Sequence, residues 1–420
     1  MTQHIDDNVK SGLNRLQRIA LMIGAAGLVV LVLGLFVTGS KSFFESYLYG
    51  FIIWNGLALG CLMLLMVHHL TAGAWGFAVQ RILEAGARTM PLTAILFLPL
   101  LFVGVYQLYP WVNAEAFYHG EHLHHIENKA WWLHLLGIQW VGPVPIPGWQ
   151  IRGPIYFAIW LAMIYRLTGL SRRLDNAPDA HLILRMRNMS GLGLVVFALT
   201  ITFAMVDWSM SLDPTWFSTI YAPQYAMGWG LAVLALACIL MSWMRNYPPH
   251  NEIMDEEQFL NLGNLVLGFV VLWAYMSFSQ FLIIWAGNLQ EEVPWYLRRY
   301  TGVPKWTSII LIIFHFFIPF FILLNRRVKK DTRYLVKICL WILVMRLLDV
   351  FYIIRPEFTI TSEGAYSMLA HVWMDLAAVA GFGGLWFAFF SWNLRQCPVL
   401  PLNDERMENA FPHREAHEHV

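Results

Sequence analysis

Apolar segments long enough to cross a lipid bilayer recur along the chain and constrain its fold more than any other feature. The first of them, residues 20–37, contains no charged side chain. A transmembrane helix needs about 20 apolar residues. Only 13% of the 420 residues are charged, which is roughly half the usual share in a soluble domain. The sequence therefore predicts an all-α integral membrane protein.

Polar turns between the apolar segments divide the chain into about ten transmembrane helices. The predicted spans are 17–38, 46–69, 91–111, 150–168, 190–208, 220–245, 261–286, 306–324, 334–353 and 369–392. The apolar patch at 131–146 is interrupted by three prolines, and we expect it, like segment 72–83, to lie at the membrane surface. Residues 17–395 then form one membrane domain between an N-terminal tail, 1–16, and a C-terminal tail, 396–420.

The distribution of Lys and Arg predicts the orientation of these spans. The connections on the side of the N-terminus carry 19 basic residues and those on the other side carry 7. The turns "YRLTGLSRR" (165–173) and "NRRVKKDTR" (325–333) dominate this difference. Because connections rich in Lys and Arg stay in the cytoplasm, we expect both termini to be cytoplasmic.

Several kinds of function and cofactor are disfavoured by the sequence. The net charge of +1 gives no global electrostatic basis for binding nucleic acid. The four cysteines are isolated, without C-x-x-C or C-x-x-C-H, which argues against iron–sulfur clusters, structural zinc and covalently attached haem. His315 and His371 lie at unequal predicted depths, which argues against a b-type haem held between facing helices. We therefore expect no cofactor or metal on this chain.

A histidine-rich loop at 119–134 has no clear metal-ligand pattern such as H-E-x-x-H. Its histidines are expected to be solvated, and its role stays open. They are His119, His122, His124, His125 and His134.

Ionisable residues within the predicted spans are the candidate functional residues, because each costs several kcal/mol in lipid unless it is paired or faces water. Arg346 and Asp349 are spaced i,i+3, and His371 and Asp375 i,i+4, so each pair shares one helical face. The complete set of proton-transfer candidates is Asp207, Asp213, Glu291, Glu292, Arg346, Asp349, His371, Asp375, His68, His69 and His315.

Histidines and carboxylates at several depths are what a proton route requires, because both of their protonation states are accessible near neutral pH when burial is suitable. Each candidate also has a structural interpretation. The Arg346–Asp349 and His371–Asp375 pairs would then only fix helix packing, and His315 would be a core histidine. His68 and His69 would extend to the membrane interface, and Asp207 and Asp213 would cap a short helix.

The segment "SQFLIIWAGNLQEEVPWY" (279–296) ends a span with acids and tryptophans on the predicted outer face. Tryptophans anchor helices at the interface, but this does not explain Glu291 and Glu292. Together with Asp207 and Asp213, these residues predict an acidic outer rim. Such a rim would exchange protons or dock a partner subunit.

Three segments resemble a known family. They are "VDWSMSLDPTWFSTIYA" (206–222), "SFSQFLIIWAGNLQEEVPWYLRR" (277–299) and "NKAWWLHLLGIQW" followed by "IRGPIYFAIW" (128–160). They are similar to the F-type membrane subunit of alternative complex III, a bacterial quinol:electron-acceptor oxidoreductase. This subunit belongs to the NrfD-like family of polysulfide-reductase membrane subunits, and the resemblance covers about residues 20 to 395.

The resemblance implies ten helices, arranged as two four-helix bundles (46–208 and 220–353) with two flanking helices, in the bacterial inner (cytoplasmic) membrane. It implies partners that include a paralogous C-type membrane subunit, an iron–sulfur subunit and c-type cytochromes. Those partners hold the iron–sulfur clusters and c-type haems, and quinol is oxidised nearby. The F-type subunit holds no redox centre and is proposed to support assembly and proton conduction.

The leading hypothesis is thus a membrane subunit of a quinol-oxidising respiratory complex that is non-catalytic alone, because quinol oxidation needs an electron acceptor that side chains do not supply. A stand-alone secondary transporter is the first alternative, although no pair of Gly/Pro-interrupted helices marks two matching halves. The second alternative is a structural membrane anchor whose polar residues hold the helices together.

Overall fold

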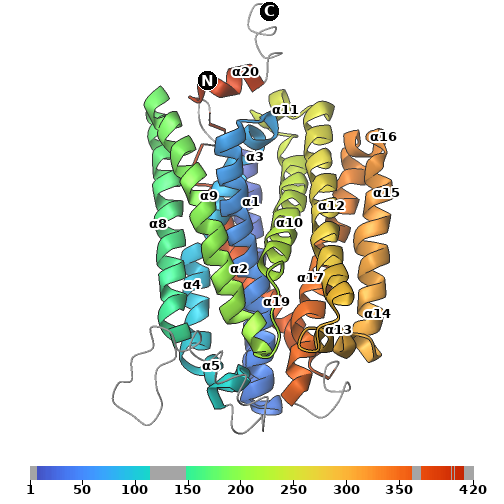
Figure 1. The fold of residues 1–420 in the computed structure, drawn as a ribbon. Helices are drawn as coiled ribbons and strands as arrows, with labels where there is room; N and C mark the ends of the chain where they lie inside the picture. Colours follow the sequence, from blue (N-terminus) through green and yellow to red (C-terminus); the bar gives the residue numbers. More distant parts are fainter. Residues whose placement is uncertain (1–6, 114–147, 362–369, 399, 402, 411–420) are drawn as a thin grey trace, which may run out of the picture.

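A computed structural model describes residues 7–113, 148–361, 370–398, 400–401 and 403–410, and all regular structure in these ranges is helical. The long helices lie side by side in one elongated bundle (Figure 1). In the described ranges, nine helical runs are long and apolar enough to cross a membrane. The chain is therefore an all-α, multi-pass membrane protein.

The nine runs coincide with nine of the predicted spans. They are α1 (Asp7–Thr38), α2 (Ser40–Thr71), α3 to α5 (Ala74–Leu108), α8 (Gly148–Asn176), α9 with η3 (Ala180–Leu212), α10 (Tyr221–Met244), α12 (Glu256–Gly287), α14 to α15 (Gly302–Leu324) and α19 (Val372–Leu394). The shorter elements are α3 (Ala74–Ala87), α4 (Met90–Pro99), η1 (Leu100–Gly104), α5 (Val105–Leu108), η2 (Pro110–Asn113), η3 (Met210–Leu212), α11 (His250–Ile253), α13 (Val293–Arg299), α14 (Gly302–Ile310), η4 (Leu311–Phe317), α15 (Ile318–Leu324), α16 (Arg326–Lys330), η5 (Arg355–Thr361) and α20 (Glu405–Ala410).

The remaining predicted span, 334–353, is also a helix, α17 (Thr332–Ile354). It carries Lys337, Arg346 and Asp349 and is too rich in charge to be counted among the nine. Arg346 and Asp349 are buried, because α17 packs against α10 and η4 inside the bundle. These two charges are thus enclosed by protein rather than by lipid, whereas Lys337 is exposed.

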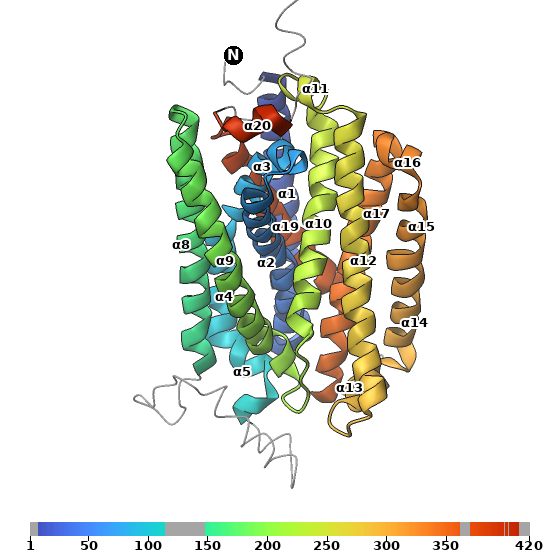
Figure 2. The same cartoon turned by 45° about the horizontal axis from the view of Figure 1, so that its top comes forward.

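The helices pack as two groups with a flanking pair. One group contains α2, α4, α8 and α9, and the other contains α10, α12, α14 to α15 and α17. The contact between α2 and α10 joins the two groups near the centre of the bundle, as Figures 1 and 2 show. α2 is buried along most of its length, whereas exposed faces such as that of α9, with Leu192, Val195 and Leu199, are apolar.

The flanking pair, α1 and α19, packs closely along its length. Small residues allow the two backbones to approach each other, as is common between membrane helices. A Cβ atom added to Gly27 would lie 2.5 Å from the backbone nitrogen of Gly381, and one added to Gly384 would lie 2.3 Å from the carbonyl oxygen of Ala20. These glycines therefore hold the two helices together by close contact.

Two of the runs contain a π-helical turn next to a proline. η1 follows Pro99 directly, and η4 precedes Pro319 in α15. Proline lacks an N–H group and clashes with the carbonyl group four residues earlier. For Pro319 this is the carbonyl of His315 inside η4, where a wider turn relieves the clash. The second π turn contains His315.

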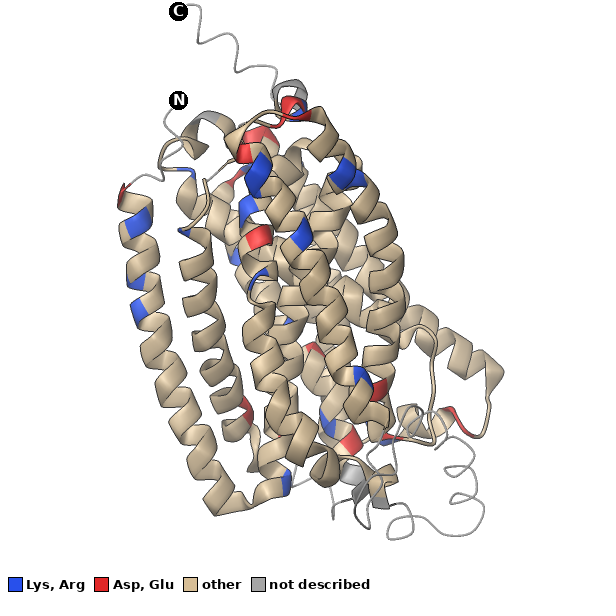
Figure 3. Ribbon diagram, turned by 90° about the vertical axis from the view of Figure 1, so that its left-hand side faces the viewer, with Lys and Arg blue, Asp and Glu red and all other residues tan. Residues whose placement is uncertain are grey.

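Charged residues concentrate toward the two ends of the bundle (Figure 3). We call one of them the basic end: it contains the start of α1, the α8–α9 connection and α16 (Figure 1). The two basic turns thus lie at the same end as the start of α1, as the sequence predicts. The opposite end contains α5 and α13, and α20 lies at the basic end.

The structure departs from the sequence prediction at the basic end. Segment 72–83 was expected at the membrane surface, but α3 is buried from Gly76 to Ala87 because α2, α8, α10 and α19 pack around it. α1 begins at Asp7 rather than at residue 17. Part of the predicted C-terminal tail folds back, and Leu400 and Met407 pack on Phe77 of α3.

Candidate functional site

Buried ion pairs and hydrogen bonds link the helices in two regions, one toward the opposite end of the bundle and one at the basic end. Four arginines of the first region, Arg152, Arg299, Arg346 and Arg355, are buried and bind buried carboxylates. A buried charge is tolerated only when it is paired and hydrogen-bonded. The geometry of each pair shows which helices it joins.

Asp207, at the end of α9, is fully buried and binds Arg152 of α8. Nε of Arg152 donates to Oδ2 of Asp207 at 2.9 Å and Nη2 donates to Oδ1 at 2.6 Å. The Tyr156 hydroxyl also donates to Oδ2, at 2.8 Å. This two-pronged geometry is the strongest form of an arginine–carboxylate contact, so the pair joins α8 to α9.

A second cluster lies around α13. Arg298 binds Asp213 and also Glu357 of η5, at 3.1 Å, and Arg299 binds Glu357 at 2.7 Å. Nη2 of Arg299 also donates to the carbonyl oxygen of Ile353, at 2.7 Å, and its guanidinium lies 3.4 Å from the centre of the Trp295 ring. The "VPWYLRR" helix is therefore fixed to the end of α17.

A third cluster joins α2, η5 and α19. Nε of Arg355 donates to Asp375 at 2.8 Å, and a second contact from its Nη2 makes the pair two-pronged. The same guanidinium donates to Glu45 at 3.0 Å and to the Ser46 hydroxyl at 2.7 Å. The sequence paired Asp375 with His371, and the structure gives Asp375 an ion pair with Arg355 as well. The Asp375 N–H also donates to the His371 carbonyl, at 3.2 Å.

The deepest cluster lies in the second helix group. Arg346 donates to Asp349, one turn away on α17, and the indole N–H of Trp273 on α12 donates to Asp349 at 3.2 Å. The Trp273 ring lies 4.2 Å from the ring of His315, edge to face. His315 is fully buried, and among the described residues neither ring nitrogen has a hydrogen-bond partner.

His315 lies near mid-depth of its span. It follows Gly302 by 13 residues, which corresponds to about 20 Å along a helix. A buried imidazole normally satisfies both nitrogens. Trp273 contacts this ring and also donates to Asp349, so His315 and the Arg346–Asp349 pair share one neighbour.

The basic end contains a hydrogen-bonded network that the sequence analysis did not predict. Gln80 and Glu84 of α3 both contact Ser171 of α8, and the Ser171 hydroxyl donates to Glu84 at 2.6 Å. Arg81 donates to Glu84 at 2.8 Å and also binds Asp175. All of these side chains are buried, so the network joins α3 to α8.

The two adjacent histidines of α2 adjoin this network. Nε2 of His68 lies 3.2 Å from Oε1 of Gln80. Both histidines are buried, so the interpretation in which they extend to the membrane interface is wrong. The reason is that α3 and the C-terminal segment cover them: Arg406 donates to the His69 carbonyl at 3.3 Å, and Asn403 donates to the Leu174 carbonyl at 3.1 Å.

The predicted acidic rim does not form one exposed surface. Asp207 and Asp213 are buried in ion pairs, whereas Glu291 is exposed and Glu292 is half-buried at the start of α13. The Asp213 carboxylate accepts hydrogen bonds from the N–H and hydroxyl of Thr215 in a turn. Its backbone N–H ends η3 by donating to the Met210 carbonyl. The predicted Arg346–Asp349 pairing is confirmed.

The sequence analysis missed residues near the ends of spans. They are Glu45, Gln80, Arg81, Glu84, Arg152, Ser171, Asp175, Arg355 and Glu357. One signal was available, because Arg81 and Glu84 have the same i,i+3 spacing as Arg346 and Asp349 and now form the same kind of pair. The partners of Arg152 and Arg355, in contrast, lie on other helices and have no local signal.

Among the described residues, no cluster of three or more His, Cys, Asp or Glu side chains is arranged to hold a metal ion. The histidine-rich loop at 119–134 and the patch at 131–146 lie outside the described residues. No protein-family model and no curated protein matches the chain.

Proposed function

We propose that this chain is a membrane subunit of a bacterial quinol-oxidising respiratory complex of the alternative complex III type. In this proposal the ten helices form two four-helix bundles flanked by α1 and α19, and the basic end faces the cytoplasm of the inner membrane. The chain holds no redox centre. It supports assembly of the complex and transfers protons.

The observation that carries the proton-transfer part is the cluster of His315, Trp273, Arg346 and Asp349 in the second helix group. A protonatable ring and a carboxylate lie between helices, where lipid does not reach them. Intramembrane ionisable groups enclosed in this way mark ion and proton pathways in other membrane proteins. His315 is the imidazole of this cluster, and within the described part of the chain neither of its ring nitrogens has a hydrogen-bond partner.

Further polar groups lie between the His315 cluster and each end of the bundle. Toward the opposite end, the Ser209 hydroxyl lies 2.8 Å from the hydroxyls of both Tyr221 and Tyr225. At the basic end, the His68–Gln80–Glu84 network enters the bundle from the other side. Hydroxyl, imidazole and carboxylate groups at both ends and at mid-depth are the arrangement that supports proton entry and exit.

The assembly part has its own support in the structure. Asp207 and Asp375 are each held by two-pronged contacts from an arginine of another element, and each contact satisfies the charge. Ion pairs of this kind favour a packing role for those two carboxylates. A purely structural anchor is therefore the second candidate, in which the buried polar groups only hold the helices in place.

Substitution of a buried acid separates the two candidates. The Asp349→Asn variant keeps the side-chain shape and removes the titratable carboxyl group of the His315 cluster. The proposal predicts assembled complexes with lower proton translocation or turnover. Loss of assembly would favour the structural anchor, and full assembly with unchanged rate and stoichiometry would contradict proton transfer.

The respiratory partners and the cofactors they carry belong to the same proposal and come from the sequence resemblance. They are a paralogous C-type membrane subunit, an iron–sulfur subunit and c-type cytochromes, with quinol bound nearby. A stand-alone transporter would instead purify alone and move a solute across liposome membranes.

A further inference from the structure

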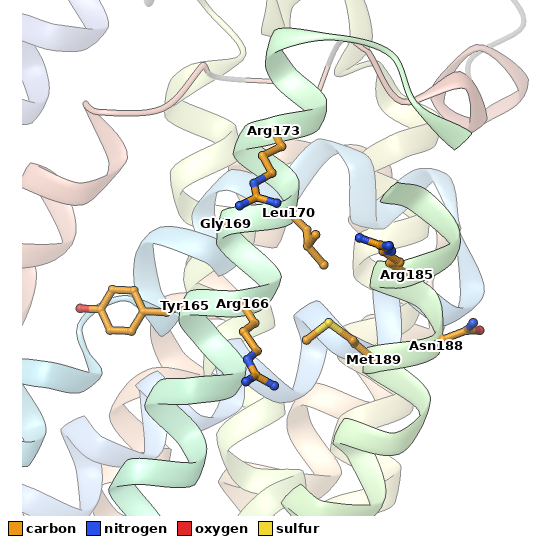
Figure 4. A pocket seen from close by; sticks show the side chains of 8 residues that line it. All are labelled: Tyr165, Arg166, Gly169, Leu170, Arg173, Arg185, Asn188 and Met189. Carbon is orange, nitrogen blue, oxygen red and sulfur yellow. The ribbon is translucent and has the colours of Figure 1, made fainter. Parts of the chain in front are cut away.

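A cleft between α8 and α9 at the basic end has a volume of about 470 Å³, within the usual range of about 300–1,000 Å³ for ligand pockets. Arg166 and Arg173 of α8 and Arg185 of α9 line it. Figure 4 shows Leu170 and Met189 pointing toward each other between the two helices, and Arg185 pointing from α9 toward α8. The cleft is thus lined by three arginines and by the apolar side chains of Leu170 and Met189.

The three arginines form no ion pair within the described part of the chain. All three are exposed, and no carboxylate of the described chain lies within ion-pair distance of any of them. The buried arginines of the bundle, by contrast, are each committed to an acid. Three positive charges that line one cleft, without ion-pair partners in the described chain, attract an anion.

The position of the cleft shows what kind of anion fits. The exposed face of α9 continues from Arg185 and Asn188 to Leu192, Val195 and Leu199, at helical spacing. Arg166 and Arg173 are seven residues apart, about 10 Å along α8. Arg173 and Arg185 therefore lie nearer the basic end, Leu170 and Met189 lie between the helices, and Arg166 lies about one turn deeper than Leu170 along α8. Three positive charges beside the exposed apolar face of α9 match a ligand with an anionic head group and an apolar tail, such as a phospholipid.

We propose that this cleft binds a phospholipid with a net negative head group. The lipid phosphate would accept hydrogen bonds from Arg166, Arg173 and Arg185, and an acyl chain would lie along the Leu192–Val195–Leu199 face. Arginine suits this role because its planar group binds phosphate oxygens in pairs. Basic clefts between helices on the cytoplasmic side are general sites for anionic lipid head groups.

Binding of phosphatidylglycerol to the full-length protein in mild detergent tests the proposal. The Arg166→Gln/Arg173→Gln/Arg185→Gln variant is compared with Arg187→Gln/Arg326→Gln/Arg333→Gln, which removes the same charge from exposed arginines that do not line the cleft. Each basic residue near an anionic lipid changes affinity roughly fivefold. The first variant should bind about 100-fold more weakly, and the control should bind like the wild type.

Phosphatidylcholine and inorganic phosphate distinguish the sources of the anion. The proposal predicts that neither stabilises the protein against heating, whereas phosphatidylglycerol raises the unfolding temperature of the wild type and of the control variant. Equal stabilisation by inorganic phosphate would overturn it, because the cleft would then be a simple anion site. Equal lipid binding by both variants would also overturn it, as would loss of a co-purifying protein, rather than of lipid, from the first variant.

Discussion

Removal of the Asp207 carboxylate should be among the most damaging single changes to the bundle. Asp207 is fully buried and accepts two hydrogen bonds from Arg152 and one from Tyr156. In Asp207→Ala the guanidinium stays buried without its counter-charge, which typically costs about 3–5 kcal/mol. The Tyr156 hydroxyl also loses its acceptor, which adds about 1 kcal/mol.

The double variant Arg152→Met/Asp207→Ala isolates the interaction. It removes both charges, and replacement of a whole buried pair by apolar side chains is often close to neutral. The double variant should therefore be more stable than Asp207→Ala alone, with a coupling free energy of at least about 2 kcal/mol. Equilibrium unfolding in mixed micelles, followed by tryptophan fluorescence, measures all four members of the cycle.

The exposed Lys10–Asp7 pair serves as the control, with N and O atoms 3.5 Å apart. Asp7→Ala should leave stability unchanged within error, since exposed pairs contribute little. If Asp207→Ala costs less than about 1 kcal/mol, or if the two single effects simply add, then Arg152 and Asp207 are not a buried, mutually dependent pair. The buried ion pairs toward the opposite end of the bundle would then not be what joins α8 to α9.

Two further changes test other parts of the fold. Gly27→Ala should destabilise the bundle because its Cβ would lie 2.5 Å from the Gly381 nitrogen, whereas Gly268→Ala, with open space around its Cβ, should be neutral or stabilising; equal unfolding temperatures for both would refute the close α1–α19 contact. Burial lowers the pKa of His250, in the α10–α12 connection, from 6.5 to about 4. Below pH 6.5 the unfolded chain binds a proton that the folded chain does not bind until about pH 4. The free energy of unfolding therefore falls by about 3 kcal/mol as the pH falls from 6.5 to about 4. His250→Gln should reduce the slope of stability against pH between these values, and an unchanged slope would show that His250 is accessible to protons in the folded state.

The sequence was sufficient to predict the long helices, because each apolar segment is long enough to cross a membrane as a helix. The basic turns also identified which connections share one end of the bundle. Segment 72–83 was predicted at the membrane surface, but the polar face of α3, with Gln80, Arg81 and Glu84, is turned toward Ser171 and Asp175 of α8. A polar face turned to water and one turned to a polar neighbour look the same in a single sequence.

The candidate site was predictable where both partners lie on one helix, as with Arg346 and Asp349. It was not predictable where the partners come from distant elements. Arg355 contacts Glu45, 310 positions away, and Asp375 in a single cluster. Such pairs exist only once α2, η5 and α19 have packed together, so neither spacing nor hydropathy reveals them.

Purification of the native protein in mild detergent, followed by mass spectrometry and visible spectroscopy, tests the central claim most directly. The claim is that a lipid-embedded chain without its own electron carrier works beside subunits that have them. We expect co-purified iron–sulfur and c-type cytochrome subunits, with haem absorbance that is lost when those subunits are stripped away. A chain recovered alone from native membranes, or haem absorbance that stays with the isolated chain, would contradict the claim.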